Sequence, residues 1–433
     1  MPARTAARKA LMACRTRGAW SDAVLRDCIQ QEHLDRKDAA LCTTLCCGVL
    51  QNQALLDYYI DSFLTGRKHL QPALRDILRL AVYQITILER IPDSAAVNEA
   101  VKQAKKLFSQ REAGLCNAVL RNMLRQKEKL TPPADYAVRY SHPAELVDLM
   151  KGSVGKRLGT ILAADNSQPE TCIQVNPMKT DPEALTEELR AAGAKVTVHS
   201  WLPGCFQLSG AGDIAQLEAF RQGRFQVQDP AARLSVQVMG LKPGMKVLDL
   251  CAAPGGKSMA AAMYMENQGE ILSCDVHGGK LPQIQGAAQR LGIDIVAVME
   301  NDASVFRSEW ENAFDAVIAD VPCSGLGVIR KKPDIRYKPA AELAELPPLQ
   351  GKILRQAGRY VRPGGVLLYS TCTILRRENE DVAKAFLSES AEFRPESLEL
   401  PAGLEEDEAG MLTLYQGIHD CDGFFMCKMR KQQ

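Results

Sequence analysis

The chain has 433 residues, of which 46% are hydrophobic and 24% are charged. This composition is too apolar for a disordered protein, and at about 100–200 residues per domain the length predicts two to four domains. No stretch approaches the ~18 consecutive apolar residues of a membrane-spanning helix, and the basic N-terminal segment lacks the apolar core of a secretory signal. We therefore expect a cytoplasmic protein with no membrane partner.

The 14 cysteines occur singly or as the pair Cys46-Cys47, without CxxC pairs or clusters of nearby histidines. This spacing argues against structural zinc, so no metal is expected. In a reducing cytoplasm most of these cysteines should be small buried apolar residues.

Charge is divided unevenly along the chain. Residues 1–140 contain 22 Lys and Arg against 14 Asp and Glu, a formal charge of +8, and the rest of the chain carries −7. A basic N-terminal third favours a module that binds a polyanion such as nucleic acid. A solvated helical surface with surplus arginine would give the same count, so charge alone leaves both interpretations open.

Residues 1–135 have the apolar periodicity of helices. Apolar side chains recur at helical spacing over Leu74–Ile85, and Ser94 is a candidate cap for a helix over 95–107. Another helix is expected over 114–130. The region is therefore predicted to be a helical bundle with a basic stripe on its last helices, made of Lys102, Lys105, Lys106, Arg121, Arg125, Lys127 and Lys129.

Residues 140–225 mix short strands with helices, which predicts a small α+β module. Its expected strands and helices are 173–175, 181–192, 195–199, 205–208 and 213–220.

From residue 226 onward, strands, turns and helices alternate. This pattern predicts a mostly parallel, doubly wound α/β sheet, which binds its ligands beyond the carboxyl ends of the strands. The expected strands are 246–250, 270–275, 295–299, 316–320 and 365–369.

The sharpest local signal is Val247–Ser258 (VLDLCAAPGGKS), a buried strand that runs into a glycine-rich turn and a helix. Gly255 and Gly256 would let the backbone approach a ligand at the helix N-terminus. The spacing fits neither the Walker nor the GxGxxG pattern, so a plain strand-to-helix turn stays open. Asp275 and Asp302 close the next two strands, where an acid can bind ribose hydroxyls or merely cap a turn. Three such features in the correct order predict a nucleoside ligand.

Two cysteines follow the ends of later strands. Cys323 lies in an Asp-Val-Pro-Cys segment that begins at Asp320, and Cys372 lies in a Ser-Thr-Cys segment. Most isolated cysteines are inert core residues. Because both of these lie just past strand ends of one predicted sheet, they can face a single cleft.

Together these motifs resemble the RNA 5-methylcytosine methyltransferases that use S-adenosylmethionine (SAM). A helical N-terminal domain similar to the antitermination factor NusB narrows the resemblance to the RsmB (Fmu/Sun) type, which methylates cytosine C5 in small-subunit (16S) ribosomal RNA. The segments that carry it are VLDLCAAPGGKS, FDAVIADVPCSGLGVIRKKPDIRY (314–337), LLYSTCTILRRENE (367–380) and DGFFMCKM (422–429).

The resemblance implies three parts. They are an all-α NusB-like RNA-binding domain (1–135), a small α+β RNA-binding module (140–225) and a class I SAM-dependent methyltransferase domain with a Rossmann-like α/β fold (226–433).

Cytosine C5 is a poor nucleophile, and addition of a thiolate at C6 activates it, as in other covalent catalysis. The resemblance assigns this attack to Cys372 and product release to Cys323. DNA cytosine methyltransferases attack with the Pro-Cys cysteine, so the motif alone leaves Cys323 as an alternative nucleophile. Asp320 would bind the cytosine edge, and Lys257 would line the catalytic cleft.

For SAM itself, the resemblance implies that Asp275 holds the ribose, Asp302 the adenine side, and that Asp320 borders both SAM and the base. The backbone of the turn would hold the methionine part, through Cys251, Ala252, Ala253, Pro254, Gly255, Gly256 and Lys257.

RNA, and not DNA, is the expected partner of a monomeric enzyme, with the target base unstacked for access. A basic segment after the Asp-x-Pro-Cys motif is expected to contact phosphates near the cleft, although each cation could instead be a solvated charge. A transfer-RNA substrate and a non-catalytic assembly factor are the alternatives; the NusB-like domain disfavours the first, and the intact cysteine pair disfavours the second. The basic residues in question are Arg330, Lys331, Lys332 and Arg336.

Overall fold

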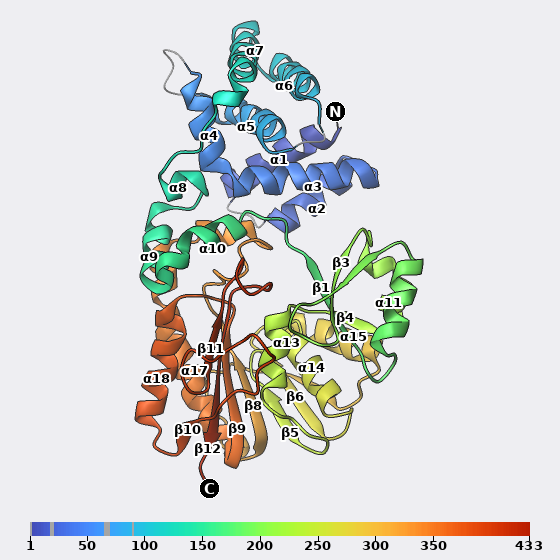
Figure 1. The fold of residues 1–433 in the computed structure, drawn as a ribbon, viewed down its shortest axis with the longest axis vertical. Coiled ribbons are helices and arrows are strands. Elements are labelled where there is room, and N and C mark those ends of the chain that lie inside the picture. Colours follow the sequence, from blue (N-terminus) through green and yellow to red (C-terminus); the bar gives the residue numbers. More distant parts are fainter. Residues whose placement is uncertain (1, 18–20, 65–69, 89–90) are drawn as a thin grey trace. The chain divides into compact units, whose positions relative to one another are not determined.

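The computed structural model divides the chain into two compact units (Figure 1). The first unit contains residues 1–148 together with 332–337, and the second contains 149–331 and 338–433. The short segment 332–337, which the resemblance assigns to the methyltransferase domain (226–433), belongs to the first unit. The structure describes residues 2–17, 21–64, 70–88 and 91–433.

The first unit is helical, as predicted. Its helices are α1 (Pro2–Arg17), α2 (Ser21–Gln31), α3 (Arg36–Gln51), α4 (Gln53–Ser62), α5 (Pro72–Thr86), α6 (Asp93–Leu107), α7 (Gln110–Arg125) and α8 (Tyr136–Arg139), and α9 (Ala144–Val154) crosses into the second unit. Among the described residues no single helix is long and apolar enough to span a membrane; α3 and α4 meet the criteria only as a pair, bent by 78°.

Helix α5 is the predicted apolar helix, and it lies in the core of this unit. Its side chains from Leu74 to Ile85, apart from Arg75, are buried against α1, α3, α4, α6 and α7. Two helix starts differ from prediction. Pro92 rather than Ser94 precedes α6, and α7 begins at Gln110 because Ser109 and Glu112 form a capping box.

The second unit contains two sheets, and the smaller one forms the predicted α+β module. Its antiparallel strands have the order β2-β3-β1-β4, and helix α11 (Pro182–Ala191) contacts β2. The predicted helix over 213–220 is divided into a short 3-10 turn and α12 (Glu218–Arg221). The strands are β1 (Thr171–Val175), β2 (Lys195–Val198), β3 (Cys205–Ser209) and β4 (Phe225–Val227), of which β4 was not predicted.

The larger sheet has eight strands, in the order β10-β12-β9-β8-β5-β6-β7, with β11 paired to β12. Strands β5 to β9 run parallel, and β12 joins β9 antiparallel. This mixed Rossmann-like sheet confirms the predicted fold class. The strands are β5 (Lys246–Asp249), β6 (Glu270–Asp275), β7 (Val296–Glu300), β8 (Phe314–Asp320), β9 (Val361–Thr371), β10 (Phe393–Pro395), β11 (Met411–Leu414) and β12 (Phe424–Lys431).

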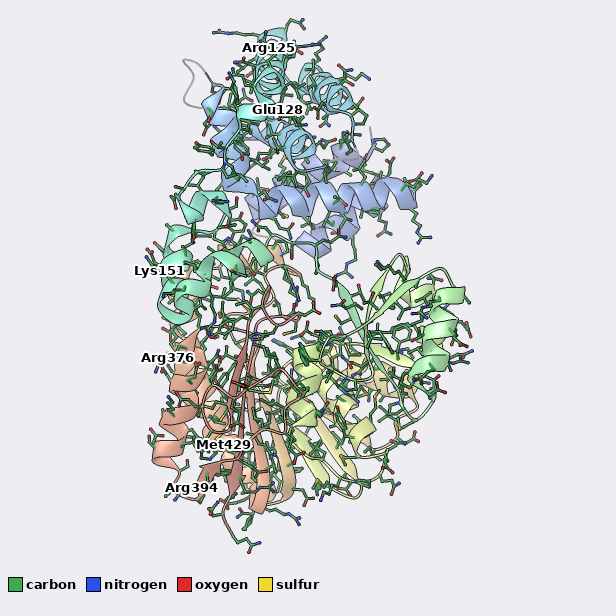
Figure 2. The ribbon with its side chains drawn as sticks, viewed as in Figure 1. Arg125, Glu128, Lys151, Arg376, Arg394 and Met429 are labelled. Carbon is green, nitrogen blue, oxygen red and sulfur yellow. The ribbon has the colours of Figure 1, made fainter. Side chains whose placement is uncertain are left out.

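Helices cover both faces of this sheet (Figure 1). Adjacent strand residues alternate between the faces: Val247 packs with α13 (Pro230–Gln237), α14 (Gly256–Tyr264) and α15 (Leu281–Leu291), while Leu248 packs with α17 (Leu346–Tyr360) and α18 (Glu380–Glu389). Met429 of β12 lies in the second of these cores (Figure 2). The carboxyl ends of the parallel strands therefore open at one edge, between the two helical layers.

Candidate active site

The glycine-rich turn connects β5 to α14 at this edge. Gly255 adopts a φ of +104°, a left-handed conformation that glycine favours, and an added Cβ would lie 3.2 Å from the Ile284 side chain. The N–H of Ala252 donates to the carbonyl of Cys274 at 2.7 Å, which fixes the turn against the neighbouring strand β6. The backbone of the turn is thus held by local packing, with the Ile284 side chain against Gly255 and the Gln228 side chain against Gly256.

Three carboxylates surround this turn, one from the end of each of the strands β5, β6 and β8. Burial raises the pKa of the Cys251 thiol, and the charges of Asp249, Asp320 and Asp275 raise it further. Asp275 accepts the N–H groups of Ala253 (3.3 Å) and His277. The turn therefore has a carboxyl group at each of three neighbouring strand ends, and one of them, Asp320, is paired with Lys257.

Asp302 differs from Asp275 in its surroundings. Its carboxylate is exposed and accepts the N–H of Ser304 at 2.9 Å, and this hydrogen bond lowers its pKa. Asp302 therefore caps a local turn after β7 in the structure.

The two candidate cysteines come together at the ends of neighbouring strands. Cys323 follows β8 and Cys372 follows β9, and their Sγ atoms lie 3.3 Å apart. The carbonyl of Cys372 also accepts the N–H of Gly327 at 3.0 Å. Residues 49 positions apart in sequence thus form one thiol pair.

A partly buried ion pair lies beside the thiols. Lys257 Nζ is 2.7 Å from Asp320 Oδ2, and the Ser370 hydroxyl donates to Asp320 Oδ1 at 2.7 Å. Burial by itself lowers the pKa of Lys257, but the charge of Asp320 outweighs it, so the lysine pKa is raised. The lysine is therefore a fixed cation at the mouth of the turn, and its ammonium also lies 5.0 Å from the centre of the Phe424 ring.

The two thiols differ in acidity. The hydrogen bond from Cys323 lowers the pKa of Cys372, and the charge of Lys257 acts in the same direction against burial and Asp320. The same hydrogen bond, together with burial, raises the pKa of Cys323 well above its ordinary value. The pKa shifts therefore favour a thiolate at Cys372 and a protonated thiol at Cys323.

One cation of the basic segment after Cys323, Arg336, is inaccessible to RNA in the structure. Arg336 is fully buried and donates to the carbonyls of Pro333, Gln51 and Ser141 within the helical unit, at 2.8–3.2 Å. The prediction that Arg336 contacts phosphate is therefore wrong, because its guanidinium binds backbone carbonyls at helix ends and in a turn.

The neighbouring cations are paired within the second unit. Arg330 lies 2.9 Å from Asp422, and Lys331 lies 2.6 Å from Asp422 and 3.0 Å from Asp229. Lys332 is exposed. Arg330 and Lys331 therefore tie the Cys323 loop to the start of β12 and to the cap of α13.

Sequence reasoning missed three buried acids around the site. Asp249 accepts the Ser258 hydroxyl, and burial raises the pKa of Asp249 to about 7. Asp422 forms ion pairs with Arg330 and Lys331. Glu378 accepts the backbone N–H of Ser324, the residue after Cys323. All three lie inside the sequence motifs that carry the family resemblance. Their position in those motifs could have identified them as candidate site residues.

A basic groove lies between α6 and α7 in the helical unit. It has a volume of about 460 Å³ and includes Lys102, Lys105, Gly114, Asn117 and Arg121. An added Cβ at Gly114 would meet nothing within 4 Å, so the floor is open there. We call this feature the α6–α7 groove; Arg125, the last residue of α7, lies farther along that helix (Figure 2).

Family models match three consecutive parts of the chain. Residues 1–125 match the NusB family, 142–215 match the ferredoxin-like domain of RsmF/B-like methyltransferases, and 236–430 match the family described as 16S rRNA methyltransferase RsmB/F. These matches confirm the resemblance seen in the motifs and in the helical N-terminal domain.

Relatives and solved structures agree with the family models. The probable ribosomal RNA small subunit methyltransferase B of Bacillus subtilis is 36% identical over 99% of this chain and 98% of its own length. PH0851, whose crystal structure is known, is 26% identical in sequence to this chain. The two structures superpose with a TM-score of 0.80 over 100% of this chain and 99% of the PH0851 chain. NSun6 from Pyrococcus horikoshii, solved with the SAM analogue SFG, shares the fold over 67% of this chain and 98% of its own, with a TM-score of 0.60 and 22% identity. The chain therefore belongs to the ribosomal RNA small subunit methyltransferase B family, a family of SAM-dependent enzymes.

Proposed function

We propose that the protein methylates C5 of a cytosine in small-subunit (16S) ribosomal RNA, with a covalent bond between Cys372 and C6 of the base. The observation that carries the proposal is the thiol pair: two cysteines from neighbouring strand ends, 3.3 Å apart, beside the ion pair of Lys257 and Asp320. Family membership supports ribosomal RNA as the substrate, and an enzyme of ribosomal RNA would work in the cytoplasm.

The glycine-rich turn fits SAM as the methyl donor. SAM carries a sulfonium and an ammonium group, and the carboxylate of Asp275 lies against the turn, where it accepts the N–H of Ala253. Bound there, SAM supplies an electrophilic methyl group. We assign the turn backbone to its methionine part and Asp275 to its ribose, and Asp302, exposed at the next strand end, to the adenine side.

The chain's own residues would act on the cytosine. The Cys372 thiolate adds to C6, which raises the electron density at C5 so that C5 can take the methyl group. A base then removes the C5 proton, the electron pair restores the ring double bond, and Cys372 leaves as a thiolate. The Asp320 carboxylate would accept a hydrogen bond from the cytosine amino group and orient the ring.

The acidities of the thiols support Cys372 over Cys323 as the nucleophile. Attack needs a thiolate, and the Cys323 hydrogen bond and Lys257 lower the pKa of Cys372. Cys323 has a raised pKa and keeps its proton. We therefore assign Cys323 to the release of methylated RNA.

Bisulfite sequencing of total RNA from cells with and without this gene tests the proposed function. We expect one protected cytosine in small-subunit ribosomal RNA to be lost without the gene. Loss confined to transfer RNA would keep the chemistry and change the substrate. If the pattern of protected cytosines is the same in both strains, a non-catalytic assembly factor becomes the better interpretation.

The α6–α7 groove is proposed as the place where the helical unit holds the RNA backbone. The groove presents Lys102, Lys105 and Arg121. Within the described residues, Lys102 alone among these three forms an ion pair, with Glu99 at 3.2 Å. Amide side chains such as Asn117 line it as well and can donate to phosphate oxygens.

The double variant Lys105→Glu/Arg121→Glu is expected to weaken RNA binding about tenfold or more at 0.1 M salt, because two phosphate contacts become repulsive. The slope of log affinity against log salt should become shallower by about 2, roughly one for each contact. Arg36→Glu/Lys37→Glu is the matched control, since both residues are exposed at the start of α3. Equal losses in the two double variants would mean that only net charge matters.

A further inference from the structure

Glu378 is a fully buried acid that the proposed chemistry does not use. It ends the short 3-10 turn Arg376–Glu378, which follows Cys372 and precedes α18. Its Oε2 atom accepts the backbone N–H of Ser324 at 2.8 Å and the side-chain amide of Gln350 at 2.9 Å. The same Gln350 amide donates to the carbonyl of Pro322 at 2.9 Å. Glu378 thus holds the residues on both sides of Cys323, one directly and one through Gln350.

The next residue, Asn379, does the same for the other cysteine. Its Oδ1 accepts the Thr371 hydroxyl at 2.6 Å, and its Nδ2 donates to the carbonyl of Thr373 at 3.0 Å. Thr371 and Thr373 are the neighbours of Cys372. Asn379 is fully buried. Two consecutive buried side chains therefore hold the two cysteine segments: Glu378 holds the residues on either side of Cys323, and Asn379 holds those on either side of Cys372.

The two cysteine segments are also linked to each other. The hydroxyls of Ser324 and Thr373, the residues that follow the two cysteines, lie 2.7 Å apart. The Tyr369 hydroxyl donates to the carbonyl of Glu378 and holds the turn against β9. The segments that carry Cys323 and Cys372 are thus joined through one buried network.

A contribution to folding stability does not explain why an acid occupies position 378. The Oε1 atom of Glu378 is buried and has no hydrogen-bond partner among the described residues. A buried carboxylate with an unpaired oxygen costs free energy that an apolar side chain of similar size would not. Such local costs are typical of functional sites, where they set a geometry that packing alone does not give.

We propose that Glu378 is a positioning residue that, with Asn379, holds the Cys323 segment in hydrogen-bond contact with Cys372. This inference rests on the proposed function, because it assumes that the contact between the thiols serves methyl transfer and product release. The negative charge of Glu378 also faces Cys323 and helps to keep that thiol protonated.

Alkylation of Cys372 by iodoacetamide tests the contact without any RNA. Loss of the hydrogen bond from Cys323 should raise the pKa of Cys372, so Glu378→Ala should slow alkylation at pH 7 several-fold and move the pH of half-maximal rate upward. The other charged groups that face Cys372, namely Lys257, Asp320 and Asp422, are unchanged in this variant. Mass spectrometry of the alkylated peptide measures the rate.

Conservative and control variants separate positioning from folding. Glu378→Gln keeps an oxygen that can accept the Ser324 N–H, so its alkylation rate should return close to that of the wild type. Gln350→Met keeps the side-chain length but loses the bond to Pro322, and it serves as the second variant if Glu378→Ala does not fold. Glu389→Ala, at the end of α18, removes only an exposed ion pair with Arg355 of α17 and should behave as the wild type.

Methyl transfer is measured on the same proteins. Glu378→Ala should lower kcat by about 10²-fold with an unchanged KM for SAM, the scale expected when a reacting group moves by about 1 Å. If Glu378→Ala alkylates and turns over at wild-type rates, the positioning role is refuted. If the wild type itself does not methylate RNA, the proposed function fails, while the alkylation result still decides whether Glu378 sets the thiol contact.

Discussion

Replacement of Cys372 by alanine is expected to abolish methyl transfer, with a loss of kcat of at least about 10³-fold, as for other enzymes that lose their nucleophile. No other described thiol combines a strand-end position with a lowered pKa and a nearby lysine, so no second nucleophile can replace it. SAM binding should stay unchanged, because the turn that we assign to SAM lies after a different strand, β5. Incorporation of labelled methyl groups into 16S RNA, with calorimetry of SAM binding, measures both effects.

Cys28→Ala is the matched control, since Cys28 is a half-buried cysteine of the helical unit and should leave the rate unchanged. Near-normal activity of Cys372→Ala would contradict the nucleophile assignment. The attack would then pass to Cys323, the alternative that the Pro-Cys motif had left open.

Replacement of Cys323 by alanine is expected to trap a covalent complex between protein and RNA. Without the Cys323 thiol, the adduct forms through Cys372, but release of the methylated base is slowed. A slowly migrating band on denaturing electrophoresis, sensitive to both protease and nuclease, measures the complex. The double variant Cys323→Ala/Cys372→Ala should lose the band, because the bond to C6 cannot form.

A Cys323→Ala protein that turns over without any trapped species would remove the release role. A band that survives in the double variant would instead indicate a crosslink through another side chain. In the first case the 3.3 Å contact between the thiols would serve only to lower the pKa of Cys372.

Much of the fold could be predicted because its signals are local. The α5 helix and the strands β5, β6 and β8 follow directly from apolar periodicity and from short runs between turns. The strands that were missed, such as β4 and β10, have only three residues each. Segments of that length carry too little pattern, and their pairing partners decide whether they become strands.

The positions of the charged side chains show the limit of local reasoning. Four cations after Cys323 have the same local character, yet Lys332 is exposed while Arg336 is buried. The difference comes from Gln51, which lies 285 positions away in sequence and offers its carbonyl to Arg336. A local sequence pattern cannot reveal a contact between residues so far apart in the chain. Whether each cation is buried or exposed therefore depends on the assembled fold.

The sequence by itself determined the chemistry of the candidate site: the turn around Gly255, the acids at the strand ends, and the two cysteines. These features are fixed by the residue types at the ends of parallel strands, which any sheet of this kind gathers at one edge. The tertiary structure alone decided how the cysteines relate to each other, because their acidity depends on a 3.3 Å contact and on Lys257. It also placed Glu378 and Asn379 behind them, since hydrogen bonds between distant backbone segments form only after the strands have paired and the core has excluded water.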